Sequence, residues 1–209
     1  GQYVDVIVSR TRKHQSLVDF AAQCACSVIN GLSERAHPCQ ALADLYTIRE
    51  HLGGLKKPRL AWIGDGNNVA RSLAVGCAKM GFPFVAASPP GYQLDEAYLE
   101  QVRREVPGAE VAQVEDSREA VREAEVIYTD VWASMGQETE KQARAETFSA
   151  YQVNAELMQQ APERAIFMHC MPAHRGMEVT ADVLDGPQSV VLEQATNRMH
   201  VQKGLLAWL

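Results

Sequence analysis

The stretch Arg59-Leu60-Ala61-Trp62-Ile63-Gly64-Asp65-Gly66-Asn67-Asn68-Val69-Ala70 decides the fold class of this 209-residue sequence. Residues 59–63 form an apolar run with the length of a buried strand, and after the glycine-rich turn a helical pattern continues to Met80. A second short apolar run, residues 84–87, follows that helix. A strand, a glycine-rich turn, a helix and a second strand form the repeating unit of open α/β sheets.

The glycine-rich turn is similar to a dinucleotide fingerprint, but it departs from one in two places. Val69-Ala70 stands where the third glycine is expected, and the strand that ends at Ala87 is followed by residues 88–91, Ser-Pro-Pro-Gly, with no acidic residue to hold a ribose hydroxyl. A nicotinamide cofactor is therefore not expected. The glycines still allow a ligand to approach the backbone closely, and Asn67 and Asn68 offer side-chain amides at the same place.

The alternation extends along the chain and predicts an α/β fold with a doubly wound, mostly parallel sheet. Further strands are expected at residues 110–114, 126–129, 166–168 and 189–192, and further helices at 94–106, 116–124, 138–148, 154–160 and 195–208. The part before residue 59 is expected to contain strands at 4–8 and 27–29, a helix at 17–24, a turn at 30–33 and a helix from Pro38 to Leu52.

Polar or reactive side chains follow three of the predicted strands. Asn67 and Asn68 come after residues 59–63, Asp130 comes after 126–129, and Cys170 comes after 166–168. Because ligands of open α/β sheets bind at the carboxyl ends of the strands, these side chains are expected to face one crevice. Cys170 itself is interpreted either as a reactive group or as an inert cysteine at the end of a buried strand.

Composition and charge exclude several classes of protein. Hydrophobic residues make up 46% and charged residues 22%, which is typical of a globular protein with a sizeable core. No apolar run reaches the roughly 18 residues of a membrane span, and the first residues do not have the pattern of a secretory signal. The net charge of −6 offers no electrostatic footprint for nucleic acid. The five cysteines lack CxxC spacing, so a reducing compartment, the cytoplasm, is expected rather than disulfides or a thiolate metal cage.

Other segments carry side chains suited to anions. His37 and Gln40 lie at the start of the helix that begins at Pro38, and either they form an anion or carbonyl site or His37 merely caps the helix. Arg198 is either a surface charge or an anion ligand that faces the crevice. The basic residues from Arg10 to Lys13, taken alone, indicate a solvated turn.

The loop after Asp130 has an unusual composition for an exposed segment. Residues 131–138 include Trp132, Met135 and Gly136. The loop is interpreted either as a hinged lid that excludes water from a site or as a segment in which Trp132 packs locally.

Five motifs then occur in the order and spacing of one enzyme family. They are His37-Pro38-Cys39-Gln40, Gly64-Asp65-Gly66-Asn67-Asn68, residues 130–136 with Ser134-Met135-Gly136, His169-Cys170-Met171-Pro172, and Asn197-Arg198. With these motifs the sequence resembles the ornithine carbamoyltransferases over essentially its whole length. The Ser-Met-Gly loop is the most specific of them, because in the family it separates ornithine enzymes from aspartate and acetylornithine relatives. The family usually has leucine where Met171 stands, a volume-conserving difference.

Carried over position by position, the resemblance implies two sets of substrate ligands. Carbamoyl phosphate would be bound by one set, Arg10, His37, Pro38, Cys39, Gln40, Cys170, Met171 and Arg198, with the backbone contributing at residues 170 and 171. L-Ornithine would be bound by a second set, Asn68, Asp130, Ser134 and Met135.

The reaction implied by the resemblance is attack by the δ-amine of L-ornithine on the carbamoyl carbon, which gives L-citrulline and phosphate. Arg10 and His37 would stabilise the charge that develops on the carbonyl oxygen. Asp130 and Cys170 would orient the amine and accept its proton. No metal or organic cofactor is implied, since direct transfer between two bound substrates gains its rate from alignment.

The resemblance also implies how the chain is divided. Residues 1–52 would be the C-terminal remnant of the carbamoyl-phosphate-binding domain, residues 53–193 a Rossmann-like ornithine-binding domain, and residues 194–209 a helix that returns toward the first lobe. The Ser-Thr-Arg-Thr phosphate loop of the family has no counterpart here, because residues 9–12 follow a strand and align with a later arginine. We therefore expect these 209 residues alone to show little turnover. The full-length form is expected to be a homotrimer or a multiple of trimers.

Two alternatives remain open. The chain could be a truncated, inactive relative that binds an amino acid or serves as an interaction module. It could also belong to a carbamoyltransferase for putrescine or another amine, which residues 134–136 disfavour. Formation of citrulline from carbamoyl phosphate and ornithine discriminates between these alternatives and the first reading.

Overall fold

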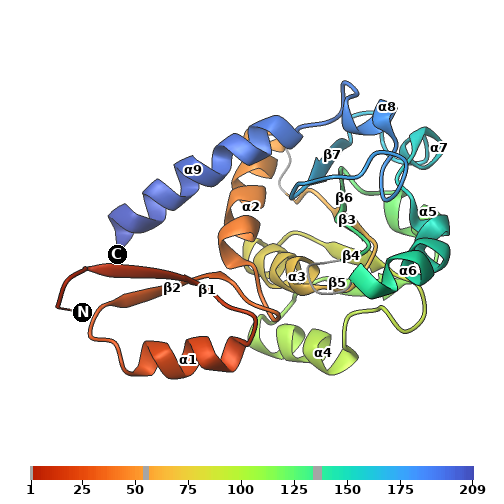
Figure 1. Cartoon of the computed structure of the whole chain (residues 1–209). Coiled ribbons are helices and arrows are strands. Elements are labelled where there is room, and N and C mark those ends of the chain that lie inside the picture. The colour runs from red at the N-terminus through yellow and green to blue at the C-terminus, as the bar shows by residue number, and fades with distance from the viewer. Residues whose placement is uncertain (1, 54–56, 134–137) are drawn as a thin grey trace.

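A five-stranded parallel sheet forms the centre of the larger lobe in the computed structural model, which describes residues 2–53, 57–133 and 138–209. Its spatial order is β5-β4-β3-β6-β7 (Figure 1). The strands are β3 (Leu60–Ile63), β4 (Phe84–Ala87), β5 (Val111–Val114), β6 (Val126–Thr129) and β7 (Ile166–His169). The strand order reverses beside β3, where β4 lies on one side and β6 on the other, and such a switch point places a crevice at the carboxyl ends of the strands.

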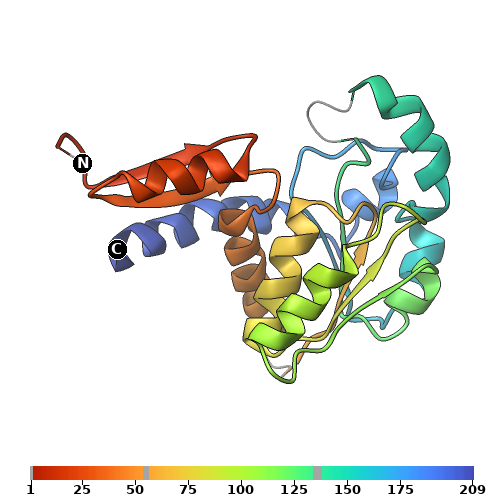
Figure 2. The ribbon, with the colours of Figure 1, turned by 90° about the horizontal axis from the view of Figure 1, so that it is seen from below.

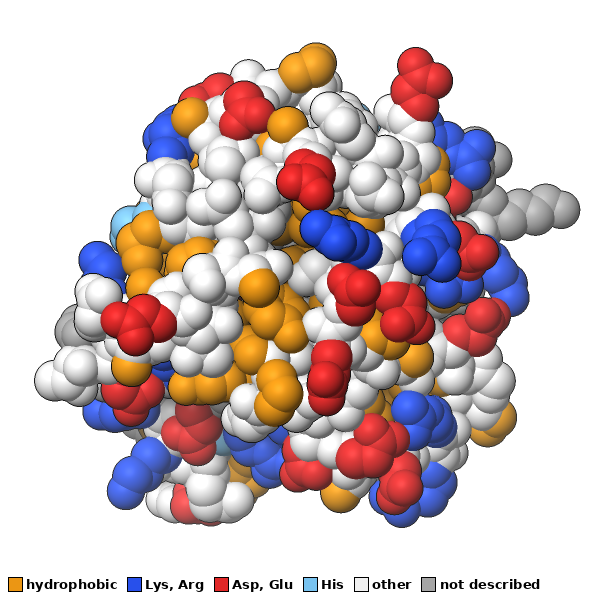
Figure 3. Space-filling view, turned by 90° about the vertical axis from the view of Figure 1, so that its right-hand side faces the viewer, with side chains coloured by type: hydrophobic (Ala, Val, Ile, Leu, Met, Phe, Trp, Pro, Cys, Tyr) orange, Lys and Arg blue, Asp and Glu red, His pale blue; other side chains and the backbone are white. Residues whose placement is uncertain are grey.

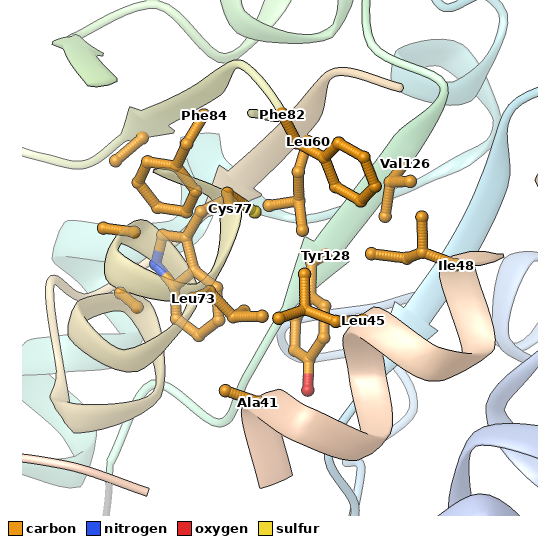
Figure 4. Packing of buried hydrophobic residues seen from close by; sticks show 14 of the residues in the cluster. Ala41, Leu45, Ile48, Leu60, Leu73, Cys77, Phe82, Phe84, Val126 and Tyr128 are labelled. Atoms are coloured by element: carbon orange, nitrogen blue, oxygen red, sulfur yellow. The ribbon is translucent and has the colours of Figure 1, made fainter. Parts of the chain in front are cut away.

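Both faces of this sheet are buried, because successive side chains of each strand point to opposite sides. Trp62, Tyr128 and Met168 belong to the apolar cluster on one face, whereas Ile63 and Phe167 belong to the cluster on the other. Figure 4 shows the first cluster between β3, β6 and the neighbouring helices. The Trp62 and Tyr128 rings stack with their centroids 5.3 Å apart. Continuous apolar strands of this kind are typical of parallel sheets covered on both sides.

Helices cover the two faces in separate groups (Figure 2). The first face is covered by α2 (Pro38–Leu52), α3 (Asn68–Met80) and α4 (Glu96–Glu105). The second face is covered by α5 (Ser117–Val121), α6 (Lys141–Phe148), α7 (Ala155–Met158) and α8 (Ala181–Leu184), with two short 3₁₀ turns, η1 (Glu138–Glu140) and η2 (Ser149–Tyr151). The sheet with its two helical layers confirms the predicted doubly wound α/β fold.

A smaller lobe precedes the sheet. It consists of the parallel pair β1 (Val6–Arg10) and β2 (Ser27–Leu32), joined by α1 (His14–Ala22). The last helix, α9 (Val191–Trp208), packs along α2 and continues toward the β1–β2 pair (Figures 1 and 2). The helices α2 and α9 thus join the two lobes.

Several predicted elements differ from the structure in type or in their bounds. The turn expected at residues 30–33 is wrong, since β2 continues through Leu32. The strand expected at residues 189–192 is also wrong: Ser189 makes only a single bridge to Phe167, and α9 already begins at Val191. The β-branched valines favour a strand locally, but Val190 is the N-cap of α9 and Val191 is its first residue. Both are buried against the sheet, so tertiary packing overrides propensity. The helix expected at 116–124 ends earlier, at Val121.

The surface carries charges of both signs. Figure 3 shows acidic and basic side chains interspersed around hydrophobic ones on the right-hand side of the molecule in Figure 1. Within the described residues, none of the helices combines the length and apolar character needed to cross a membrane.

Candidate active site

A pocket of about 850 Å³ lies where the two lobes meet, at the carboxyl ends of strands from both. Arg10 and Leu32 are the last residues of β1 and β2, and Asp130 and Cys170 directly follow β6 and β7. The lining residues come from loops that follow strands and from two helices: Arg10, Thr11, Arg12, Leu32, Ser33, Glu34, His37, Asp65, Asn67, Asn68, Val69, Asp130, Val131, Cys170, Met171, Pro172 and Arg198. The crevice predicted from the strand ends is therefore present.

Sheet register brings Asp130 and Cys170 together. Thr129 and His169 are paired residues of β6 and β7, so the next residue on each strand emerges at the same edge. The Cys170 Sγ lies 3.1 Å from Asp130 Oδ1, which also accepts a hydrogen bond from the backbone N–H of Val131 at 2.8 Å. Asp130 is 9% exposed.

Asn67 completes this cluster, although the residue-by-residue carry-over assigned a role only to its neighbour Asn68. The Asn67 Nδ2 donates to Asp130 Oδ2 at 2.7 Å, while its Oδ1 accepts from the backbone N–H groups of Val69 and Ala70 at the start of α3. The capping bonds fix the amide so that its donor points at Asp130. An asparagine at the helix N-cap position of a glycine-rich turn is the sequence signal that identifies it.

Asn68 has a different partner. Its Nδ2 donates to the backbone carbonyl of Ser33 at 2.7 Å, so in this structure it ties α3 to the segment that follows β2. The side chain nevertheless lines the pocket.

The Cys170 thiol is held in its protonated form. Burial and the neighbouring Asp130 carboxylate raise its pKa well above the usual value. A thiol of this kind donates a hydrogen bond to Asp130 and is a poor nucleophile at neutral pH. The structure therefore does not favour Cys170 as a reactive nucleophile. It favours Cys170 as a hydrogen-bond donor that orients polar groups.

His37 immediately precedes α2 and makes no capping hydrogen bond through its side chain. Its backbone N–H donates to Ser72 Oγ at 2.8 Å. Burial, with the positive charges of Arg198 and Arg10, lowers the pKa of His37 to about 4. The ring is therefore neutral at physiological pH and can donate to a carbonyl oxygen as an uncharged imidazole.

The remaining residues of the His37–Gln40 motif do not line the pocket. Pro38 occupies the first turn of α2, and Cys39 is buried with its Sγ 3.5 Å from the Asn30 carbonyl oxygen. Gln40 is 1% exposed and accepts a hydrogen bond through Oε1 from Arg198 Nη1. Gln40 therefore reaches the pocket through Arg198, which does line it.

Most basic and acidic side chains of the pocket lining come from different elements. Glu34 is an exception, since its backbone N–H donates to the carbonyl oxygen of Arg12. Arg10 and Arg12 contribute from the segment that ends β1, and Arg198 contributes from α9. Asp65 and Asp130 contribute from the ends of β3 and β6. One wall is thus suited to an anion and the other to a cationic or hydrogen-bond-donating group.

Three side chains in the described part of the chain could in principle share a metal ion. Ligand atoms of Asp130, His169 and Cys170 lie within 4.8 Å of one another. The His169 ring, however, accepts a hydrogen bond from the Met171 backbone N–H at Nδ1 (2.9 Å), and its Nε2 lies 3.4 Å from Glu178 Oε1. Both ring nitrogens of His169 face other partners. The ring therefore orients the Cys170–Met171 backbone and is not turned toward the pocket.

The loop after Asp130 is described only in part. Ser134 and Met135 lie outside the described residues. Trp132 is buried and stacks on Phe148 with ring centroids 6.1 Å apart, so this tryptophan packs locally. Arg144 binds the Trp132 carbonyl oxygen at 2.9 Å and Asp65 Oδ2 at 2.8 Å, and these bonds tie the start of the loop to the turn after β3.

Comparison with known proteins gives one consistent result. The family described as aspartate/ornithine carbamoyltransferase, carbamoyl-P binding domain, matches residues 1–50, and the corresponding Asp/Orn binding domain matches residues 56–209. An ornithine carbamoyltransferase of Methanopyrus kandleri is 52% identical over 100% of this chain and 67% of its own length, and that of Bacillus subtilis is 51% identical over 98% and 65%.

Solved structures agree. The ornithine carbamoyltransferase from Pyrococcus furiosus superposes with a TM-score of 0.92 at 48% identity, covering 99% of this chain and 66% of that one. The anabolic ornithine carbamoyltransferase from Campylobacter jejuni gives a TM-score of 0.92 at 34% identity, with coverages of 99% and 69%. The chain spans about two thirds of the length of the relatives it matches.

Proposed function

The chain belongs to the aspartate/ornithine carbamoyltransferase family, and on that premise we propose that the protein containing it transfers the carbamoyl group of carbamoyl phosphate to the δ-amine of L-ornithine, giving L-citrulline and phosphate. The observation that carries the proposal is one pocket with two chemically different walls. Arg10, His37 and Arg198 form a wall suited to an anionic carbonyl compound, and the Asp130–Cys170 pair forms a wall suited to an amine.

The first wall supplies donors for the carbamoyl phosphate. The guanidinium groups of Arg10 and Arg198 match phosphate oxygens in charge and geometry. Neutral His37 donates to the carbonyl oxygen, where negative charge develops as the amine attacks. The low pKa of His37 supports this role, because a neutral imidazole still carries one N–H group that can donate a hydrogen bond. The backbone at Cys170 and Met171 is proposed to contribute from the opposite edge.

The second wall prepares the amine. The amine must lose a proton to attack, and Asp130 is the group proposed to receive it, because the Cys170 thiol is already protonated. A nitrogen–carbon bond then forms as the bond between the carbamoyl carbon and the phosphate oxygen breaks, and phosphate leaves with the electron pair. Asn67 and Cys170 each donate to one oxygen of Asp130, which keeps the carboxylate oriented toward the pocket.

Ornithine binding is assigned in part by resemblance. Asn68 and Asp130 line the pocket, and Ser134 and Met135 are proposed as further ligands from the Ser-Met-Gly segment. We propose the domain division at residues 1–52, 53–193 and 194–209, under which Arg10 and His37 belong to the first part, Asn68 and Asp130 to the second, and Arg198 to the third. We also propose a role in arginine biosynthesis, a trimeric assembly and a cytoplasmic location, the last supported by cysteines that are all unpaired in the structure.

A citrulline assay tests the proposal. The 209-residue chain and the same chain preceded by the first part of the carbamoyl-phosphate lobe of a relative are each given carbamoyl phosphate with ornithine, putrescine or no amine. We expect citrulline from the longer protein and little or none from the chain alone. A preference for putrescine would overturn the substrate assignment. Binding of ornithine without turnover in the longer protein would favour the amino-acid-binding alternative.

A further inference from the structure

A buried carboxylate, Asp44, lies behind the pocket at the centre of a polar network. Asp44 is on α2, is 0% exposed, and receives hydrogen bonds from three elements. Gln40 Nε2 donates to its Oδ1 at 2.8 Å, Gln194 Nε2 to the same oxygen at 2.7 Å, and Tyr128 OH to Oδ2 at 3.0 Å. Figure 4 shows the Tyr128 side chain next to α2, with the hydroxyl oxygen at its end.

The network reaches both walls of the pocket. On one side Gln40 continues through its Oε1 to the guanidinium of Arg198. On the other side the Gln194 Oε1 accepts from the backbone N–H of His169 at 3.0 Å, one residue before Cys170. Asp44 therefore connects an arginine of the anion wall with the strand end that carries the thiol of the amine wall.

The direction of each bond depends on the charge of Asp44. An ionised carboxylate offers only acceptors, so both glutamine amides must present their NH₂ groups to it. Their carbonyl oxygens are consequently turned outward, toward Arg198 and toward the His169 N–H. Without the carboxylate, the amide of Gln40 could rotate by half a turn and present a donor to Arg198, which would repel it.

We propose that Asp44 is a positioning residue for the carbamoyl transfer. It orients the Gln40 amide, which holds Arg198 in the anion wall. Through Gln194 it also fixes the position of this wall relative to the strand end that carries Cys170. This inference rests on the function proposed above. Asp44 is not one of the residues that line the pocket, and it acts through its hydrogen-bond partners Gln40, Gln194 and Tyr128.

Protonation of Asp44 gives the hydrogen-bond network a pH dependence that can be measured. Burial raises the pKa of Asp44 to about 7, although the hydrogen bonds from Gln40, Gln194 and Tyr128 work in the opposite direction. Other titratable or charged groups that act on this site are Tyr128 on β6, Cys77 on α3, Cys170 after β7 and Arg198 on α9. For Tyr128, Cys77 and Cys170, burial raises the pKa above its usual value, so among these groups Asp44 changes charge near neutrality.

The same helix pair offers a matched control. Thr47 is also 0% exposed on α2, and its Oγ1 accepts a hydrogen bond from Asn197 Nδ2 of α9 at 3.0 Å. Thr47→Val removes a buried polar contact between α2 and α9 but leaves the Gln40–Arg198 bond untouched. A purely structural role of Asp44 in joining these helices would be mimicked by this variant.

The experiment compares wild type, Asp44→Asn and Thr47→Val in the complete protein that contains this chain. We expect Asp44→Asn to raise the KM for carbamoyl phosphate about tenfold, because asparagine lacks the charge and has one acceptor oxygen, so its NH₂ group opposes one of the donors Gln40, Gln194 and Tyr128. The KM for ornithine should change less than about twofold, since the amine wall keeps its direct ligands. In wild type the KM for carbamoyl phosphate should rise as the pH falls below about 7, and this step should be absent in Asp44→Asn but retained in Thr47→Val.

The outcomes separate this inference from the function on which it rests. A wild-type protein that makes no citrulline refutes the proposed function, whereas an active wild type with equal effects of Asp44→Asn and Thr47→Val refutes the positioning role alone. A measurement without substrates tests the hydrogen-bond network around Asp44 in either case. The side-chain NH₂ signals of Gln40 and Gln194 in ¹⁵N NMR spectra should shift together across pH 7 in wild type. If they do not respond to Asp44→Asn, the inference is overturned.

Discussion

The thiol of Cys170 donates to the carboxylate of Asp130 across 3.1 Å, and the two residues follow paired positions at the ends of neighbouring strands. This relationship assigns different tasks to them. The carboxylate can accept a proton, and the thiol, whose pKa burial and Asp130 raise well above its usual value, can only donate a hydrogen bond near neutral pH.

Asp130→Asn should therefore reduce kcat far more than Cys170→Ser. An asparagine at position 130 has one acceptor oxygen, so it can keep the bond from Asn67 or the bond from Cys170, and it cannot take the amine proton. We therefore expect a loss of about 10²–10⁴ in kcat. A serine at position 170 keeps a hydrogen-bond donor and should cost only about tenfold. Steady-state kinetics of citrulline formation measure both values. Equal losses would contradict the assignment of Asp130 as the proton acceptor.

Alkylation of Cys170 provides a test that needs no substrate. The thiolate, and not the thiol, attacks iodoacetamide and displaces iodide, so modification of Cys170 should be slow at pH 7–8 and should accelerate only at strongly alkaline pH. Asp130→Asn removes the neighbouring negative charge and should speed modification at pH 8 by about tenfold. Mass spectrometry of the peptide that contains Cys170 follows the reaction. Fast alkylation of the wild type at pH 7 would show that the thiol is ionised after all.

Arg198→Gln should weaken carbamoyl phosphate binding with little effect on ornithine. Loss of a guanidinium that lines the anion wall removes a charge-assisted interaction of about 1.5–3 kcal/mol, so the KM for carbamoyl phosphate should rise at least tenfold. Arg175→Gln is the matched control, because Arg175 pairs with Asp185 on an exposed surface. If both variants behave alike, Arg198 is only a surface charge.

Arg144→Met should destabilise the fold, because it leaves Asp65 buried without its partner. The side chains of Arg144 and Asp65 are 7% and 16% exposed, and losing one member of such a pair costs about 3–5 kcal/mol. Arg118→Met breaks an ion pair whose side chains are 67% and 75% exposed and should cost less than about 1 kcal/mol. Urea unfolding monitored by circular dichroism compares the two, and a small effect of Arg144→Met would contradict the buried clamp.

His37 should make the protein less stable as the pH falls. Its pKa is lowered from 6.5 to about 4 in the folded protein, so below pH 6.5 the unfolded chain binds a proton that the folded chain does not. Stability present above pH 6.5 is lost as the pH falls toward 4, by about 3 kcal/mol at most. Asp44, whose pKa is raised to about 7, acts in the opposite direction, but it does so equally in a His37→Gln variant.

The difference in unfolding free energy between wild type and His37→Gln, measured from pH 7 to pH 4, therefore isolates His37. Wild type should lose about 3 kcal/mol relative to the variant over this range. Parallel curves would mean that His37 titrates normally in the folded protein.

Much of the fold followed from local patterns. The helix from Pro38 to Leu52, the N-cap of Asn154 and the strands β4 and β6 lie where periodicity and capping chemistry predict them. The errors occurred where tertiary contacts outweigh local preference. Val191 packs against the sheet as the first residue of a helix, and Asn30 and Gly31 lie within β2 although this pair of residues is typical of a turn.

The candidate site shows the same division. Asp130 and Cys170 could be placed together from sequence, because parallel strands bring their carboxyl ends to one edge. The sequence could not decide whether Asn67 or Asn68 is the partner of Asp130, since this depends on which of them caps α3. Gln40 was expected in the pocket beside His37, but the helix turns its side chain inward, where it holds Arg198.

The sequence by itself determined the alternation of strands and helices and the placing of polar side chains at strand ends, because periodicity, turn residues and capping act over a few neighbouring residues. Only the tertiary structure decided how these side chains are paired. Gln194 reaches Asp44 across 150 positions of sequence, and Arg198 reaches Gln40 across 158. Such contacts depend on how two helices pack, and hydrogen-bond direction inside a buried network depends on every partner at once.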